Sequence, residues 1–347
     1  MIRKILCILF ATTIMGCAQR QGNTIPKPIF IDPNYQGSCD PEIVYNRSDE
    51  LYYIYYTARR SGKRNTFLQT PIGVASSQDL ANWKFEGYCR FDGQHDDKDA
   101  DATFWAPAII ATKDSLHMFA TFKPDTLTTK GAWGGKGSIV HYATSLNNPV
   151  NGWQKMQVMH ADTLSTLDAS TYWVDDTAHL WFMAKNAMYK TQEYTLIHRT
   201  TKDFDAWETI KQPLGDVYNK SVTGIGYEEA PYIFLWKGSY WLMTDPHNGF
   251  AIYKSEDATY WKFQGYILKE PGTGKMDVAR ARHGSVLIKN DRAFLFYHVE
   301  YNRDYEGEPI FKQSLENRKS ALQMAELKLV KGKLVCDRDK DIVLAKD

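Results

Sequence analysis

Three carboxylates stand at the start of short apolar segments that are spread along this chain. Asp40 opens the segment DPEIVY, Asp168 opens DASTYW and Glu229 opens EAPYIF. Hydrolysis of a glycosidic bond without a cofactor uses two carboxyl groups, one to protonate the leaving oxygen and one to activate water or attack carbon. Crowded carboxylates cannot all ionise easily, so bringing these three together would raise at least one pKa. Such chemistry requires a fold that gathers the three side chains.

Two further segments complete a repeat of this form. Trp105 opens WAPAII and His283 opens HGSVLI. About ten to twelve residues after each opening comes an aromatic run of strand length with little helical periodicity. These runs are 52–57, 116–121, 180–185, 240–245 and 293–298. A strand repeat of roughly 53–65 residues predicts an all-β, five-bladed β-propeller. Since the first strand of each blade lines the axis, the five opening residues should converge on one pocket.

A second repeat supports the blade count. Four polar turns end in a tryptophan, at Trp83, Trp153, Trp207 and Trp261. Three turns carry Ser or Thr followed by Asp, which favours local backbone hydrogen bonds, and the second has Asn instead. We expect the tryptophans to pack in the core between neighbouring blades. The missing fifth copy suggests closure of the last blade by mixed N- and C-terminal strands, with 321–339 forming two strands around a Lys331-Gly332 turn.

The beginning of the chain has the pattern of a targeting segment. Arg3 and Lys4 precede an apolar stretch that is too short for a membrane-spanning helix, and Gly16-Cys17 follows it. This resembles a bacterial lipobox in which Cys17 is lipidated; the alternative is an ordinary signal peptide. We therefore expect a lipid-anchored monomer on the periplasmic or cell-surface face of a bacterial membrane. The expected organisation is a signal peptide at 1–16, a lipidated tether at 17–27 and the propeller at 28–347.

Composition excludes several functional classes. The chain has 347 residues, 14% aromatics and a net charge of +1 with interspersed signs, which gives no electrostatic footprint for nucleic acid. Cys39, Cys89 and Cys336 match no metal-ligand spacing, and one disulfide of undetermined pairing is compatible with them. Phosphate loops, dinucleotide fingerprints and nucleophile elbows do not occur in the sequence.

The residues themselves suggest how the three carboxylates divide the work. Glu229 has the longest side chain and precedes the fairly apolar Ala230-Pro231-Tyr232, so it is the natural proton donor. Asp40 could be the base, and Asp168 could tune the acid and orient substrate.

In this order the segments DPEIVYN, WAPAII, LDASTYWVDD, EEAPYIFLWKGSYWLMTD and RHGSVL resemble glycoside hydrolase family 43 over about residues 30–340. The resemblance implies a five-bladed propeller that acts with inversion on arabinofuranosides, xylosides and related sugars. It also implies that Asp40 is the base, Asp168 the pKa modulator and Glu229 the acid.

Two departures from the family pattern affect these roles. The usual Glu-Gly-Pro motif reads Glu-Ala-Pro here, and a second glutamate, Glu228, precedes it. Glu228 could compete for the acid role, but Glu229 is preferred because it stands two residues before the proline, where the motif places the acid. Ala108 replaces an acidic residue of the second-blade motif. Both changes favour a divergent subgroup with its own substrate.

Other residues are candidates for substrate binding. Arg59 and Arg60 end a first-blade strand and could reach a substrate carboxylate or hydroxyl, or could simply face solvent. Trp105 could stack on a sugar ring. Arg282 and His283 open the fifth blade, where the histidine has either a hydrogen-bonded structural role or a place in the site.

No cofactor is required for this chemistry. The resemblance implies that a histidine at position 283 can lie near a central water or a structural calcium ion close to the axis. One neutral imidazole is a poor ligand set for that hard cation. The acidic loop at 95–101 lacks EF-hand spacing and is expected to be solvated.

The favoured function is an exo-acting, extracytoplasmic glycosidase for furanoside or xyloside-type linkages of oligosaccharides or polysaccharides. A non-catalytic glycan-binding propeller lipoprotein is the alternative, because fold alone does not prove activity. Three axial carboxylates favour the enzyme. A retaining hydrolase of the invertase type would need an Arg-Asp-Pro motif, which the sequence lacks.

Overall fold

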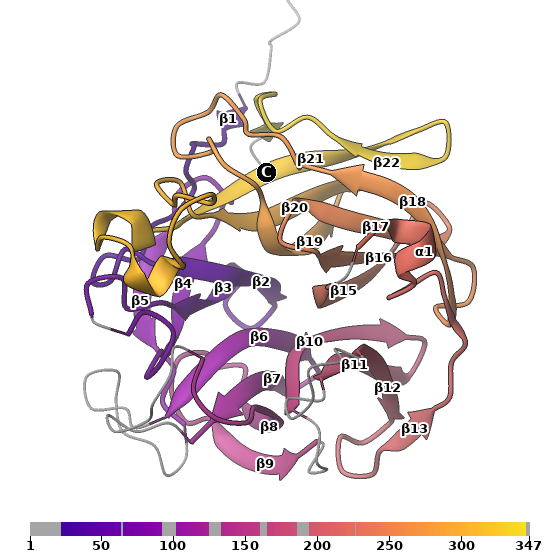
Figure 1. The fold of residues 1–347 in the computed structure, drawn as a ribbon. Helices are drawn as coiled ribbons and strands as arrows, with labels where there is room; N and C mark the ends of the chain where they lie inside the picture. Colours follow the sequence, from indigo (N-terminus) through magenta and orange to yellow (C-terminus); the bar gives the residue numbers. More distant parts are fainter. Residues whose placement is uncertain are drawn as a thin grey trace, which may run out of the picture.

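Five β-sheets surround a central axis, as Figure 1 shows in a view along that axis. The computed structural model describes residues 22–63, 65–91, 102–124, 133–159, 165–185, 194–225 and 227–344. Within these ranges each blade is an antiparallel meander whose first strand lies innermost. The predicted all-β, five-bladed propeller is confirmed.

The strands follow the chain blade by blade. Blade one has β2 (Ser38–Asn46), β3 (Leu51–Ala58), β4 (Ile72–Ser77) and β5 (Lys84–Tyr88). Blade two has β6 (Thr103–Ala111), β7 (Ser115–Lys123), β8 (Ser138–Ser145) and β9 (Gln154–Val158). Blade three has β10 (Ser165–Val174), β11 (Thr177–Lys185), β12 (Tyr194–Thr201) and β13 (Glu208–Ile210). Blade four has β15 (Glu229–Trp236), β16 (Ser239–Asp245), β17 (Phe250–Ser255) and β18 (Tyr260–Ile267), with β14 (Leu214–Gly215) added in parallel. Blade five has β19 (Arg282–Lys289), β20 (Arg292–Val299), β21 (Ala321–Val330) and β22 (Lys333–Cys336).

The tryptophan turns form as predicted. In blade three, the Asp203 carboxylate accepts the N–H groups of Asp205 and Ala206 at 2.9 and 3.0 Å, which fixes the turn. The tryptophans pack against the neighbouring blade. Trp153 of blade two is fully buried and meets Tyr55 of blade one edge-on, with 5.9 Å between ring centroids. The core role expected for these residues is therefore confirmed at this junction.

The ring closes differently from the prediction. Residues 321–339 do supply two strands, β21 and β22, joined by the predicted Lys331-Gly332 turn. All four strands of blade five, however, come from the C-terminal part of the chain. The N-terminal strand β1 (Asn23–Thr24) pairs instead with β23 (Val343–Leu344) in a separate two-stranded sheet. β22 covers only Leu327–Val330 of β21, and the N-terminal segment bonds to the same edge at Leu322, which forms an antiparallel bridge with Phe30. The predicted mixed closure is therefore confirmed only as this isolated bridge, and β22 supplies the fourth strand.

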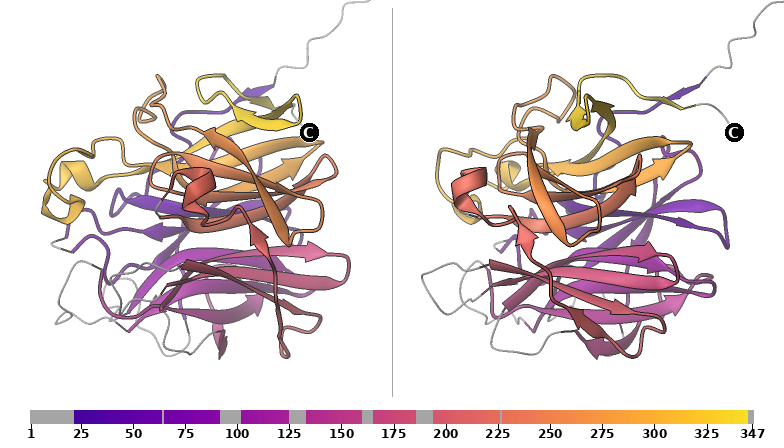
Figure 2. Two further views of the ribbon diagram at one scale, coloured as in Figure 1. Left: turned by 45° about the vertical axis from the view of Figure 1, so that its right-hand side comes forward. Right: turned by 90° about the vertical axis from the view of Figure 1, so that its right-hand side faces the viewer.

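One end of the axis carries most of the short helices. The 3-10 helices η1 (Ile310–Lys312) and η2 (Glu316–Arg318) and helix α1 (Lys220–Thr223) lie on one face in Figure 2. The inner strands β15 and β19 begin at this face, because these helices lie in the connections that lead into β15 and out of β20. We call this end the mouth. Among the described residues, no helix is long and apolar enough to cross a bilayer.

Candidate active site

A β-bulge interrupts the inner strand of every blade near the mouth, where the strand register shifts. The bulge residue has a positive φ, a conformation that is costly for a side-chain-bearing residue. These residues are Asp40 (51°), Ala106 (42°), Asp168 (54°), Ala230 (53°) and His283 (27°). Asp40, Asp168 and His283 thus occupy equivalent positions as predicted. The predicted equivalence was wrong by one residue for Trp105 and Glu229, since Ala106 and Ala230 fill the bulge in their blades.

The bulges are joined from blade to blade by hydrogen bonds. In four of the five junctions the bulge N–H donates to a side chain near the end of the preceding blade's second strand. The acceptors are Thr57 Oγ1 for Ala106 (2.8 Å), Thr121 Oγ1 for Asp168 (3.0 Å), Asp245 Oδ2 for His283 (3.0 Å) and His298 Nδ1 for Asp40 (3.1 Å).

The junction between blades three and four is the exception. Met183 occupies the equivalent position, opposite Leu167, and its thioether is only a weak acceptor. The Ala230 N–H donates instead to Asp168 Oδ2 at 3.1 Å. Asp168 therefore supports the backbone in addition to any catalytic role.

Asp40 is buried at the mouth between two imidazoles. Its Oδ1 lies 3.5 Å from His283 Nδ1 and 3.6 Å from His298 Nδ1. Burial alone would raise the pKa of Asp40, but His283, Arg59 and His298, together with a hydrogen bond from Thr57, hold it below the ordinary value. Asp40 is therefore ionised, as a base must be.

Asp168 and Glu229 share the other side of the site. Burial, followed by the negative charges of Glu229 and Asp40, raises the pKa of Asp168 well above its ordinary value. Burial would also raise the pKa of Glu229, but its contacts with His247, Arg282 and Tyr227 lower it. The surroundings therefore favour the protonated form of Asp168 and the ionised form of Glu229.

The two adjacent glutamates point to different surroundings. Glu229 Oε1 lies 2.6 Å from His247 Nε2 and 3.3 Å from Arg282 Nη2, and the Tyr227 hydroxyl donates to its other oxygen. Glu228 is almost fully buried, and its Oε2 accepts from Thr244 and Tyr253 at 2.5 and 2.6 Å. The structure therefore groups Glu229 with the other candidate residues and gives Glu228 contacts inside blade four.

A buried carboxylate that sequence reasoning missed organises the arginines. Glu300 contacts Arg59 Nη1 at 2.6 Å, Arg303 Nη1 at 2.6 Å and Arg282 Nη1 at 3.5 Å. Arg282 also donates to Asp245 Oδ2 at 2.7 Å, so it is held between three acids. The only sequence signal was the position of Glu300, directly after a strand that ends at the mouth.

Arg60 does not join this group. Its guanidinium lies 5.2 Å from the ring centroid of Tyr35, in the segment that leads into β2. Of the two arginines considered for substrate binding, Arg59 therefore lies with the candidate site residues, whereas Arg60 is buried elsewhere, and the solvent-facing alternative does not apply to Arg60.

Trp105 forms part of an aromatic wall on the blade-two side. Its indole N–H donates to the Phe67 carbonyl at 2.7 Å, and Lys123 Nζ lies 4.0 Å from its ring centroid. One face of the indole is thus already occupied by a cation. Trp133, which is 55% exposed and stacks on Phe67 at 4.3 Å, offers the more open aromatic surface.

A second buried carboxyl lies two residues beyond Asp40 on the same strand. Glu42 is 5% exposed, and its Oε1 accepts the Ile109 N–H of blade two at 3.2 Å. Burial raises the pKa of Glu42 to about 8. Its side chain is therefore mostly protonated at neutral pH.

Comparison with known proteins places this geometry in a family. The sequence profile described as "Glycosyl hydrolases family 43" matches residues 33–247. The chain belongs to glycosyl hydrolase family 43. Among curated protein sequences, no match to this family 43 protein was found.

Solved structures share its fold at low sequence identity. A thermostable family 43 glycoside hydrolase is 15% identical, with TM-score 0.65 over 90% of this chain and 97% of the other. A β-xylosidase/α-arabinofuranosidase from a compost microbial metagenome, in complex with xylotriose, is 13% identical, with TM-score 0.62 over 92% and 97%. A β-1,3-galactosidase with galactodeoxynojirimycin is 13% identical, with TM-score 0.60 over 92% and 100%. The family 43 protein therefore has the fold of these hydrolases over nearly its whole length.

Metal and cysteine predictions have different outcomes. The described parts of the family 43 protein contain no cluster of three or more His, Cys, Asp or Glu side chains that could hold a metal ion. The axial calcium ion remains a prediction.

Cys39, Cys89 and Cys336 are all free thiols, so the disulfide considered from the sequence does not form among them. The acidic loop at 95–101 and Cys17 lie outside the described residues.

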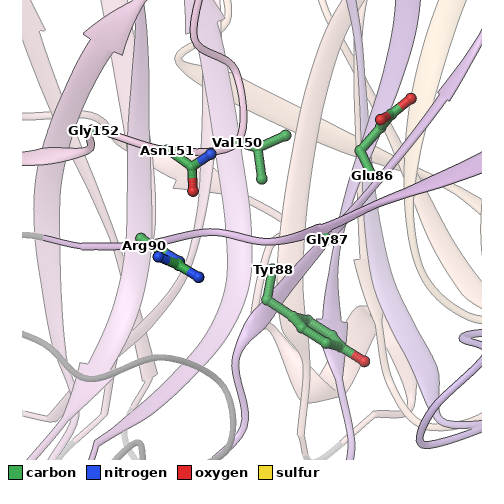
Figure 3. A pocket seen from close by; sticks show the side chains of 7 residues that line it. All are labelled: Glu86, Gly87, Tyr88, Arg90, Val150, Asn151 and Gly152. Atoms are coloured by element: carbon green, nitrogen blue, oxygen red, sulfur yellow. The ribbon is translucent and has the colours of Figure 1, made fainter.

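Two cavities of the family 43 protein lie away from the carboxylates. One, of about 470 Å³, is lined by Glu86, Tyr88 and Arg90 of blade one and by Asn151 of blade two (Figure 3). The other, of about 630 Å³, is lined in part by Tyr301. Neither of these two cavities is lined by Asp40, Asp168 or Glu229.

Proposed function

We propose that this family 43 protein is an inverting glycoside hydrolase in which Asp40 activates water and Glu229 protonates the leaving oxygen. Asp168 controls how a proton is distributed between its own carboxyl group and that of Glu229. The observation that carries the proposal is the convergence of three carboxyl groups, since the negative charges of Asp40 and Glu229 both act on the buried Asp168. Hydrolysis requires one ionised and one protonated carboxyl group.

Substrate binding would bring Glu229 into the protonated form that a general acid requires. Contacts with His247 and Arg282 lower the pKa of Glu229 and favour its ionised form. A sugar hydroxyl that accepts a hydrogen bond from Arg282 would weaken this hold and raise the pKa of Glu229. The proton favoured on Asp168 could then move to Glu229, which needs it to protonate the leaving oxygen.

The proposed substrates are furanosides or xylosides at the ends of complex glycans. The name of one structural relative, a β-xylosidase/α-arabinofuranosidase, supports this class, and another relative, a β-1,3-galactosidase, adds galactosides to the test. A screen of aryl arabinofuranosides, xylosides and galactosides, followed by oligosaccharides, tests it. Absence of turnover on all of them, with measurable glycan binding, would favour the non-catalytic alternative.

Hydrolysis is expected to invert the anomeric centre. An inverting pair leaves room for a water with carboxyl groups about 6.5–9.5 Å apart, whereas a retaining pair lies about 5–5.5 Å apart. Asp40 and Glu229 come from blades one and four, with Asp168 interacting with both. Proton NMR of the first-formed sugar decides the stereochemistry. Retained configuration, or a glycosyl ester trapped on Asp40, would contradict the proposal.

The protein is further proposed to be lipid-anchored outside the cytoplasm through Cys17. The apolar stretch and the Gly16-Cys17 pair support this. One acyl chain holds a protein only marginally, whereas two or more anchor it stably. Cys17→Ser is expected to move the protein from the detergent phase to the aqueous phase, or to block its processing. An aqueous-phase wild type with no lipid by mass spectrometry would exclude the anchor and leave the enzymatic proposal intact.

A further inference from the structure

A solvent-exposed histidine touches the candidate acid. His247 lies in the turn between β16 and β17, and its side chain is 47% exposed. Its Nε2 is 2.6 Å from Glu229 Oε1. Among the contacts described for Glu229, this is the one whose partner is an imidazole with nearly half of its side chain in solvent.

The backbone of this turn holds the imidazole in place. The His247 N–H donates to Asp245 Oδ1 at 2.6 Å, and its carbonyl accepts from Arg280 Nη1 at 3.3 Å. The Tyr227 ring meets the imidazole edge-on, with 4.8 Å between centroids. His247 also has a φ of 64°, so the turn adopts a left-handed conformation to present the side chain. Histidine is among the residues enriched in this region.

Each inverting turnover leaves the two catalytic groups in the wrong protonation states. Glu229 gives its proton to the leaving oxygen, and Asp40 takes one from the attacking water. Before the next turnover Asp40 must release a proton to solvent and Glu229 must receive one. The Glu229 side chain is 20% exposed and Asp168 and Arg282 are each 5% exposed, so the 47% exposed His247 has the widest access to bulk water among these groups.

We propose that His247 returns the proton to Glu229 after each turnover. The proposal rests on the function proposed above. The imidazolium Nε2–H bond breaks, the proton moves to Glu229 Oε1, and the neutral imidazole then takes a proton from solvent. The proton released by Asp40 balances the one taken up, so no other reactant is needed. His247 acts through Glu229 and does not itself contact the reacting atoms.

The charged and titratable groups around the pair come from four elements. Glu229 faces Tyr227 from the preceding loop, Arg282 from β19, Asp168 from β10 and His247. His247 itself contacts Tyr227 through its ring and Asp245 and Arg280 through its backbone.

The test compares His247→Asn with the wild type. Asparagine tolerates the left-handed backbone but cannot carry the proton at neutral pH. Substrates are the 2,4-dinitrophenyl and methyl glycosides of the sugar that the wild type hydrolyses best. The methyl glycoside needs a protonated acid, so its kcat should fall roughly tenfold to a hundredfold, with the loss growing as pH rises. The dinitrophenyl glycoside should be nearly unaffected, and added imidazole should restore the methyl glycoside rate.

Several outcomes would overturn the relay. An equal loss on both substrates without imidazole rescue would mean that His247 only positions Glu229. An unchanged methyl glycoside rate would mean that protons reach Glu229 another way. Asn248→Ala, which alters an exposed neighbour in the same turn, is the matched control and should match the wild type. A wild type that inverts normally while His247→Asn is unaffected rejects the relay alone, whereas an inactive wild type rejects both proposals.

Discussion

Glu229→Gln is expected to lower kcat for glycosides with poor leaving groups by about 100- to 10,000-fold, the usual contribution of a general acid. Glutamine keeps the shape of the side chain but has no proton to give. Substrates with good leaving groups need little protonation and should lose much less. The measurement is kcat across a series of aryl glycosides, where the variant should show a steep dependence on the leaving-group pKa.

Glu228→Gln is the matched control for this experiment. Glu228 is buried against Thr244 and Tyr253, and a glutamine oxygen can still accept from both. Its activity should therefore stay within a few-fold of the wild type. If Glu228→Gln were the inactive variant and Glu229→Gln the active one, the assignment of the acid would be wrong.

Glu42→Gln is expected to stabilise the protein at neutral pH by up to about 3 kcal/mol. The pKa of Glu42 is raised from an ordinary 4.5 to about 8, so the folded chain binds a proton that the unfolded chain has released. Below pH 4.5 Glu42 is protonated in both the folded and the unfolded chain, so it has little effect on the free energy of unfolding. As the pH rises from 4.5 to 8, the free energy of unfolding falls, because only the folded chain keeps this proton bound. Each pKa unit corresponds to about 1.4 kcal/mol. Glutamine stays neutral and can still accept the Ile109 N–H.

Denaturant unfolding of both proteins at several pH values measures this effect. The difference between Glu42→Gln and wild type should vanish near pH 4 and approach its maximum near pH 8. Buried His117 and His141, whose pKa values burial lowers to about 4 and 3, destabilise both proteins in acid, so the difference is the relevant quantity. Glu256→Gln, at an exposed position, should show no comparable gain. A constant difference across pH would contradict a protonated Glu42.

The sequence predicted the elements better than their contacts. Five openings followed by aromatic runs located every inner strand, because strand pairs repeat at nearly constant spacing. The one-residue offset at Trp105 and Glu229 was not predictable, since a bulge is set by backbone pairing that leaves no local pattern. The fold and the convergence of the candidate carboxylates were therefore predictable, but the exact strand register was not.

Residues in turns and strand ends were missed for a different reason. His247 belongs to a polar Asp-Pro-His-Asn-Gly stretch that resembles any exposed turn, and only the fold brings it to Glu229. Glu300 follows a strand by one residue, and its partner Arg59 comes from a distant part of the chain, whereas Arg303 stands only three residues after it. Long-range ion pairs of this kind carry no signal in a single sequence.

The hydrogen bond from the Ala230 N–H to Asp168 changes how inactive descendants of such a propeller should be recognised. A lineage that had given up hydrolysis and kept only glycan binding would still need an acceptor at this junction, where Met183 is a poor one. Selection for folding would then preserve Asp168 while Asp40 and Glu229 drifted. Survival of Asp168 has little diagnostic value for catalysis, and the pair Asp40 and Glu229 carries that distinction.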